Sequence, residues 1–196
     1  MAELLYQGHA SFRIKSKDGV IVYIDPFAGS GYELPADIIL VTHQHGDHNC
    51  INLPAKNKDC IIIQNSDALV AGTYRSFSLK QMEIQAVPAY NKMHDKRECV
   101  GYLILVDGIK LYFAGDTSET KEMKELAAEK IDYAFLPIDG IYNMDIKEAE
   151  RCSNVIKARH TVPIHMKPGA LFSEERAAAF DGVGQLVIRP GDVVIL

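Results

Sequence analysis

Short apolar runs separated by turn residues dominate the first half of the chain, and they predict a series of strands. Asp18-Gly19 stands between two such runs and is a strong hairpin signal, and Asp107-Gly108 separates a later pair. The segment at 37–41 is apolar at every position after Asp37, as expected of a buried strand. In chain order we expect strands at 11–15, 20–24, 37–41, 60–64, 74–79, 82–88, 100–106 and 110–114, with a short helix near 66–71.

The second half alternates between helical and strand periodicity. Ser118 is a candidate N-cap for a helix that runs to residue 129. Asp145, with Glu148 three residues later, is a capping-box variant that predicts a helix over 145–158. The remaining expectations are an Ala-rich helix at 173–180 and strands at 133–137, 161–164, 185–188 and 192–195.

This order of elements predicts an α+β architecture in which helices cover the outer faces of mixed sheets. Residues 1–115 and 116–196 each read as a sheet with helices, which favours a two-sheet sandwich with a functional site at the seam. A chain of 196 residues suits one compact domain. We therefore expect a single domain over 1–196.

The strongest chemical signal is His43-Gln44-His45-Gly46-Asp47-His48, which directly follows the apolar run at 37–41. His43 and His45 are two apart, so an extended backbone sends both rings the same way. Gly46 permits a turn, after which Asp47 and His48 can face a neighbouring position. Imidazole nitrogens and carboxylate oxygens suit Zn, Mn, Fe or Co. Chance histidines in a polar loop are a poor alternative, because three of the chain's seven histidines fall within six residues.

With this motif the sequence resembles the metallo-β-lactamase-fold hydrolases, whose signature is His-x-His-x-Asp-His after a strand. The resemblance covers nearly the whole chain. Gly8-His9-Ala10-Ser11-Phe12 is similar to the opening of a subgroup that includes the ascorbate-lactone hydrolases and many uncharacterised bacterial metal-dependent hydrolases. Asp25 matches the family's early strand-end aspartate, Asp116 matches its metal-bridging aspartate, and His165 matches its last histidine. The resemblance implies a four-layer αββα sandwich.

It also implies a dinuclear site with two divalent ions, zinc or manganese, held by His43 and His45 in the first position, by Asp47, His48 and His165 in the second, and by Asp116 as a bridge. The residues themselves agree with a bridging role for Asp116. This aspartate follows an apolar strand, and Gly115 before it allows a close backbone approach. A carboxylate can bridge because each of its two oxygens can bind a cation.

One position departs from the family pattern. The first metal's third histidine is expected after the strand ending near Pro88, and by register Asn91 takes its place. Three alternatives follow. Asn91 is a weak ligand that favours manganese, or His94 swings in instead, or Asn91 binds substrate while the first metal has fewer ligands. We expect a preserved metal site with an altered metal preference.

Four further residues are expected near the site, each with two interpretations. His9 either orients a ligand or touches substrate, or it is a hydrogen-bonded strand histidine. Asp25 is expected to fix the tautomer of a ligand histidine rather than to bind metal. Asp139 and Tyr142 follow a strand that should end near the metals, where they line the substrate pocket or form an ordinary helix-entry loop.

These features predict a metal-dependent hydrolase that uses a metal-bound hydroxide on a small lactone, ester or phosphodiester, with Asp47 orienting the hydroxide or shuttling its proton. A rival interpretation is a non-catalytic metal or ligand sensor that keeps the fold with a degenerate first metal site. The expected partner is a small-molecule substrate.

Composition and charge limit the partners and the cellular location that we expect for this protein. The net charge of −5 and the lack of a dense Lys/Arg run argue against nucleic-acid binding. No apolar run is long enough for a membrane span, and no signal peptide is recognisable at Met1. Four scattered cysteines without a CxxC pair suggest free thiols. We expect a cytoplasmic protein, and homo-oligomerisation is left open.

Overall fold

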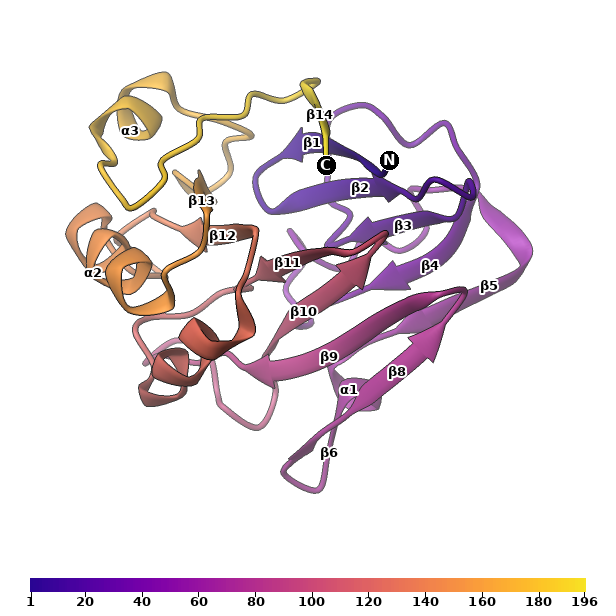
Figure 1. The fold of residues 1–196 in the computed structure, drawn as a ribbon, viewed down its shortest axis with the longest axis horizontal. Coiled ribbons are helices and arrows are strands. Elements are labelled where there is room, and N and C mark those ends of the chain that lie inside the picture. The colour runs from indigo at the N-terminus through magenta and orange to yellow at the C-terminus, as the bar shows by residue number, and fades with distance from the viewer.

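The computed structural model describes all residues 1–196, and its core lies between two facing six-stranded sheets (Figure 1). The first sheet has the order β14-β1-β2-β3-β4-β5, and the second has the order β13-β12-β11-β10-β9-β8. The strands of the first sheet are β1 (Glu3–Gly8), β2 (Ser11–Lys15), β3 (Ile21–Ile24), β4 (Ala36–Leu40), β5 (Lys56–Ile63) and β14 (Val193–Ile195). Those of the second are β8 (Ser76–Leu79), β9 (Met82–Pro88), β10 (Val100–Val106), β11 (Ile109–Phe113), β12 (Tyr133–Pro137) and β13 (His160–Ile164).

Each sheet combines antiparallel and parallel pairing. In the first sheet β1 to β3 form antiparallel pairs, and β3, β4 and β5 then run parallel. In the second sheet β8 to β11 are antiparallel neighbours, and β11, β12 and β13 run parallel. The carboxyl ends of parallel strands meet at one edge of a sheet, and loops at such an edge are a usual place for a functional site.

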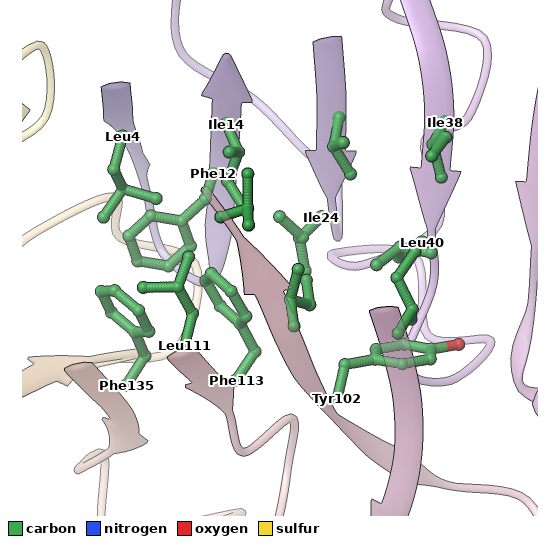
Figure 2. Packing of buried hydrophobic residues seen from close by; sticks show 14 of the residues in the cluster. Leu4, Phe12, Ile14, Ile24, Ile38, Leu40, Tyr102, Leu111, Phe113 and Phe135 are labelled. Carbon is green, nitrogen blue, oxygen red and sulfur yellow. The ribbon is translucent and has the colours of Figure 1, made fainter. Parts of the chain in front are cut away.

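Aromatic and branched side chains from both sheets fill the interface (Figure 2). Phe12 projects from β2 toward the second sheet, with its ring centroid 4.6 Å from that of Phe135 and 5.2 Å from that of Phe113. Phe113 and Phe135 are themselves stacked at 4.5 Å. Such edge-on, tilted and stacked aromatic contacts add to the stabilisation from burial. The sheets are therefore joined through a buried aromatic centre.

Helices cover one outer face of the sandwich. The 3-10 helix η1 (Lys121–Glu129), α2 (Ile146–Ile156) and α3 (Glu174–Ala179) pack on the second sheet (Figure 1). Loop residues such as Tyr32, Leu34 and Ile51 cover the outer face of the first sheet instead. Along the chain, β5 is followed by a short helix, α1 (Asn65–Ala68), and by the hairpin of β6 (Leu69–Val70) and β7 (Thr73–Tyr74). None of the helices combines the length and apolarity that a bilayer crossing requires.

The structure confirms the α+β sandwich and most of the predicted elements. Asp145 is the N-cap of α2 and accepts a hydrogen bond from the backbone of Glu148, as expected. The Glu148 carboxylate departs from a reciprocal capping box, because it accepts from the backbone N–H of Glu119. Ser173 caps α3.

Three expectations about local structure were wrong. Ser118 caps no helix, because its backbone is bound to Tyr90 and η1 begins only after Thr120. The segment 185–188 is not a strand, since only Gln185 forms an isolated bridge. The prediction that residues 1–115 and 116–196 form separate sheets was also wrong. β8 to β11 pair onward with β12, so the second sheet begins near residue 76, and β14 returns to the first sheet beside β1.

The aromatic centre gives a direct test of how the sheets are joined. Replacing Phe12 with alanine is expected to lower the free energy of unfolding by about 3–5 kcal/mol, because a fully buried ring is lost and a cavity remains. Urea denaturation followed by circular dichroism measures the loss. Leu105→Ala, at a solvent-facing position of β10, is the control and should cost about 0.5 kcal/mol. Equal losses in the two variants would contradict the packing described.

Candidate metal centre

The candidate site lies where strands of both sheets end. β4 leads into the segment with His43, His45, Asp47 and His48, and β11 leads through two residues to Asp116. The other contributors also follow strands: His9 after β1, Asp25 after β3, Asp139 after β12, His165 after β13, and His94 in the loop after β9. Residues far apart in the sequence thus meet at one edge of the sandwich. This agrees with a site at the seam of the two sheets.

The side chains form three overlapping groups, in each of which the candidate ligand atoms lie within 4.8 Å of one another. His43, His45 and His94 make the first group. The second and third groups consist of His9, Asp47, His48 and His165, and of His43, His48 and Asp116. Every residue expected to bind metal is therefore present in one of the three groups.

Asp116 lies at the centre of the arrangement. Its Oδ1 is 3.3 Å from Nε2 of His48, and its Oδ2 is 3.3 Å from Nε2 of His94 and 3.4 Å from Nε2 of His165. Nε2 of His43 is 3.9 Å from the same Oδ2. The Asp116 carboxylate thus faces histidines of the first group and of the second group. This is the placement that a bridging ligand needs.

Gly115 allows this placement. Its φ of +64° lies in the left-handed region, and a Cβ there would come within 2.8 Å of the Val100 carbonyl oxygen and 3.1 Å of the Thr42 Cβ. Any other residue would push the Asp116 loop away from β10 and the histidine motif. The close approach inferred from the sequence is therefore present.

The donor set fits divalent cations. Nε2 of His43, His48, His94 and His165 and Oδ1 of Asp116 are all buried and have no hydrogen-bond partner. A buried polar atom without a partner costs on the order of 1–3 kcal/mol, so five such atoms in one place require an explanation. Their lone pairs converge, and a divalent cation of the Zn or Mn type would satisfy them together.

Neighbouring residues fix which nitrogen of each ring faces inward. Asp25 Oδ2 lies 2.9 Å from Nδ1 of His48 and accepts a hydrogen bond from the Thr42 hydroxyl. That hydroxyl is 3.0 Å from Nδ1 of His43. When the Nδ1 atoms carry the protons, both Nε2 lone pairs are free to face the site. Asp25 therefore lies where it was expected. Thr42 was missed, although it directly precedes His43.

The structure agrees with the second of the three alternatives for this position, in which the His94 ring faces the site in place of Asn91. The Oδ1 atom of Asn91 accepts from the backbone N–H groups of Met93 and His94, at 2.8 and 3.0 Å, and lies 3.0 Å from Nδ1 of the His94 ring. Asn91 thus supports the histidine, and the His94 ring occupies the position assigned to Asn91 by register. His43, His45 and His94 together offer three imidazole nitrogens within 4.8 Å of one another, although the register placed Asn91 at the third position.

Asp139 plays a similar part beside the second group. Its Oδ2 is 3.1 Å from Nδ1 of His165, and its Oδ1 accepts from the backbone N–H groups of Ile141 and Tyr142 at 2.6 and 2.7 Å. The Asn91 amide donates to the Tyr142 carbonyl oxygen at 2.8 Å. The loop that carries Tyr142 is thereby tied to both groups of histidines. Sequence reasoning placed Asp139 and Tyr142 in this region without predicting that link.

His9 contacts Asp47. Its Nε2 is 3.0 Å from Asp47 Oδ2, and its Nδ1 is 3.1 Å from the carbonyl oxygen of Ala170. Both ring nitrogens lie within hydrogen-bond distance of an oxygen, so binding a cation through either nitrogen would break one of these contacts. The ring is fully buried, and it is better placed to hold the Asp47 carboxylate than to reach a substrate.

Three of these residues have left-handed backbones at strand ends: His9 with φ 58°, Asp25 with φ 44° and His165 with φ 42°. This conformation is costly for residues other than glycine, and histidine and aspartate are among those that adopt it more often. The backbone of His165 donates to the His9 carbonyl oxygen at 2.8 Å. The turns direct the side chains of both sheets into one site.

The electrostatics keep the carboxylates charged. Burial alone would raise the pKa of Asp116, but the surrounding histidines, His48 and His165 above all, hold it well below its usual range. Burial and the nearby charge of His48 lower the pKa of His43 to about 2, so its ring is neutral. For His48 burial is outweighed by Asp116 and Asp25, and its pKa is raised to about 9.

A solvent-accessible depression of about 310 Å³ opens onto the cluster. It is lined by His45, Asp47, Met93, His94, Asp116, Tyr142 and His165. Asp47 has a side chain that is 35% exposed, whereas the Asp116 side chain is 4% exposed. A small molecule can therefore reach Asp47 and the inner face of the histidines from solvent.

An imidazole-rich, partly open centre between two sheets defines a metallohydrolase type of site. A sequence profile described as a beta-lactamase superfamily domain matches residues 3–165, which is most of the chain. The chain therefore belongs to the β-lactamase superfamily, as its motifs suggested.

Individual relatives agree with this assignment. The UPF0173 metal-dependent hydrolase of Thermococcus onnurineus is 31% identical over an alignment of 227 positions that covers 100% of both proteins. The UPF0173 relative from Pyrococcus furiosus is 30% identical over 98% of both. A crystal structure from Parabacteroides distasonis, of a protein assigned to the metal-dependent hydrolases, superposes with a TM-score of 0.78 at 29% identity, covering 94% of this chain and 91% of the other. The chain is a metal-dependent hydrolase of this superfamily.

The raised pKa of His48 predicts how metal uptake depends on pH. In the metal-free protein His48 carries a proton below about pH 9, and a metal must displace it to bind Nε2. Affinity for zinc should therefore rise about tenfold per pH unit between pH 6 and 8 and level off above about pH 9. Calorimetry in buffers of different ionisation enthalpy would also detect the released proton. An affinity that does not change between pH 6 and 8 would refute this account of His48.

The roles of Asn91 and His94 can be separated by substitution. His94→Ala should lower the metal content per chain, because a candidate ligand is removed. Asn91→Ala should weaken metal binding only about 10- to 100-fold, because the His94 ring remains and loses only its support. Asn91→Asp keeps the acceptor for the ring N–H and should retain more affinity than Asn91→Ala. Metal content by mass spectrometry and competition with a chelator measure both effects.

Asn154→Ala on the exposed side of α2 is the matched control. A loss in Asn91→Ala as complete as that in His94→Ala would make Asn91 a ligand after all.

Proposed function

We propose that the chain holds two divalent metal ions in one dinuclear site and uses them to hydrolyse a small lactone, ester or phosphodiester. The observation that carries the proposal is the set of unpartnered buried atoms around Asp116, next to a depression that admits a small molecule. His43, His45 and His94 would hold one ion, and Asp47, His48 and His165 the other. Asp116 would contribute to both.

Two bound divalent ions lower the pKa of water toward neutrality and polarise the carbonyl or phosphoryl oxygen of a substrate. The residues of the chain supply orientation. Asp25, Thr42 and Asn91 hold the imidazoles with their Nε2 atoms facing the site. Such rigid support reduces the reorganisation that accompanies the reaction.

Asp47 is the residue best placed to act on the attacking water. Burial would raise its pKa, but the hydrogen bond from His9 and the charge of His48 outweigh that effect and lower it. The carboxylate is therefore ionised at neutral pH. Oδ2 is held by His9, but each carboxylate oxygen has two lone pairs, so Asp47 can contribute to the ion and also accept a hydrogen bond from water in the depression. We assign Asp47 to orienting water and receiving its proton transiently.

Zinc is the ion we favour, with manganese second. The proposed first site has three imidazole ligands, and the altered preference for manganese inferred from Asn91 loses its basis once His94 is the ligand. A screen of lactones, phosphodiesters and thioesters, run with zinc and separately with manganese, tests both the substrate class and the metal. Hydrolysis of none of the three classes with either ion would contradict the proposal.

Removing a central ligand tests the link between metal and activity. His48→Ala and Asp116→Ala should each reduce the metal content and lower kcat/KM by at least about 10³-fold, because the oriented water and the polarised substrate oxygen are both lost. Inductively coupled plasma mass spectrometry and the hydrolase assay are run on the same samples. Cys152→Ala, a buried change away from the site, is the control for folding. Full activity with unchanged metal content in either ligand variant would overturn the assignment.

A further inference from the structure

A second depression adjoins the one that opens onto the metal centre. It has a volume of about 690 Å³, compared with about 310 Å³ for the inner one. The two share Met93 and Tyr142 in their linings. The outer depression also includes Tyr90, Ile141 and the charged residues Lys92, Glu119 and Glu148. We refer to it as the outer trough.

Exposed apolar side chains gather around this trough. Met93, Ile141 and Tyr142 are 60%, 66% and 45% exposed, and they are three of the nine large hydrophobic residues of the chain that face solvent. Their clustering beside one depression is informative because single exposed apolar residues are ordinary, whereas a contiguous group next to a site indicates binding.

Hydrogen bonds to the backbone hold the walls of the trough. Asn91 donates to the Tyr142 carbonyl oxygen and accepts from the backbone N–H of Met93. Asp139 accepts from the backbone of Ile141 and Tyr142. The same two residues contact ligand histidines through their side chains, so the position of the trough is set relative to the metal centre.

The charges around the trough disfavour an anionic occupant. The charged residues that line the trough are two carboxylates, those of Glu119 and Glu148, and one ammonium group, that of Lys92. Glu148 already accepts from the backbone of Glu119, and the nearest cation to Glu119 is Arg151 at 3.8 Å. A neutral apolar group would avoid repulsion by these carboxylates while covering the exposed side chains.

We propose that the outer trough is a substrate subsite that binds an uncharged apolar arm, alkyl or aryl, extending from the group that reacts at the metals. This proposal rests on the proposed function and defines its substrate class more closely. The substrate is then an amphiphilic molecule with a compact reacting head and an apolar extension. The alternative is a compact polar metabolite that fills only the inner depression.

Hydroxamates test the subsite without requiring turnover, because the hydroxamate head chelates a metal whether or not the protein hydrolyses anything. Zinc-loaded protein is titrated with acetohydroxamate and with octanohydroxamate by calorimetry. A buried methylene contributes up to about fourfold in affinity, so six additional methylenes in an open trough should tighten binding at least about tenfold. A ratio near one would overturn the proposal.

Substitutions in the trough test where the alkyl chain of octanohydroxamate binds. Ile141→Ser combined with Tyr90→Ala should lower the octano-to-aceto ratio at least about threefold, with acetohydroxamate affinity little changed, because both residues line the trough and neither lines the inner depression. The hydrogen bonds of Tyr90 to Thr117 and Ser118 use its main-chain atoms, so truncating its ring keeps them. Val193→Ala, an equally exposed change on β14, is the control and should keep the full ratio. A ratio that survives in the double variant would place the chain elsewhere and refute the subsite.

A third probe tests whether the trough prefers an uncharged arm or an anionic one. Suberic acid monohydroxamate carries a carboxylate at the end of a chain of the same length, and it should bind more weakly than octanohydroxamate. Tighter binding would show that the arm is anionic and overturn the proposal. Because none of these measurements depends on hydrolysis, a failed activity screen with positive binding would reject the proposed reaction and leave the subsite standing.

Discussion

The carboxylate of Asp116 and the imidazoles that face it form the interaction on which the rest of the site depends. An anionic group that is 4% exposed and lies 3.3 to 3.4 Å from three ring nitrogens is unfavourable unless positive charge compensates it. Protons on the rings supply some of that charge in the metal-free protein, as the raised pKa of His48 indicates. Divalent ions would supply more and would also satisfy the unpartnered nitrogens. Gly115, the left-handed turns and the two-sheet frame all serve to bring this carboxylate and these rings together.

A small number of supporting residues connect the metal centre with its surroundings. Asp25 and Thr42 join the ends of β3 and β4 and set the orientation of His43 and His48. Asn91 and Asp139 act on the other side, and each contacts a ligand histidine and the loop that bears Tyr142. Metal geometry and the shape of the substrate-facing surface are therefore not independent. A change at Asn91 or Asp139 would disturb both the ligand histidines and the loop that bears Tyr142, so the outer trough and the metal centre are structurally coupled.

Local signals in the sequence identify most of the fold and much of the candidate site. The histidine motif, Asp116 and His165 each follow an apolar strand, and that placement is visible in the residues alone. The sequence alone could not decide whether Asn91 or His94 faces the site. That choice depends on a tight turn in which Asn91 accepts hydrogen bonds from the backbone and ring of His94. The assignment of strands to sheets failed at residue 115 for a similar reason, since parallel pairing of β11 with β12 is a long-range event without a local signal. The supporting role of Thr42 likewise depends on Asp25, which is distant in sequence.

The most direct test of this account is anomalous diffraction at the zinc edge on crystals of the zinc-loaded protein. The account predicts two peaks on either side of the Asp116 carboxylate, one bounded by His43, His45 and His94 and the other by Asp47, His48 and His165, with Asn91 and His9 outside both coordination shells. A single peak, or a peak coordinated by the Asn91 oxygen or the His9 ring, would contradict it.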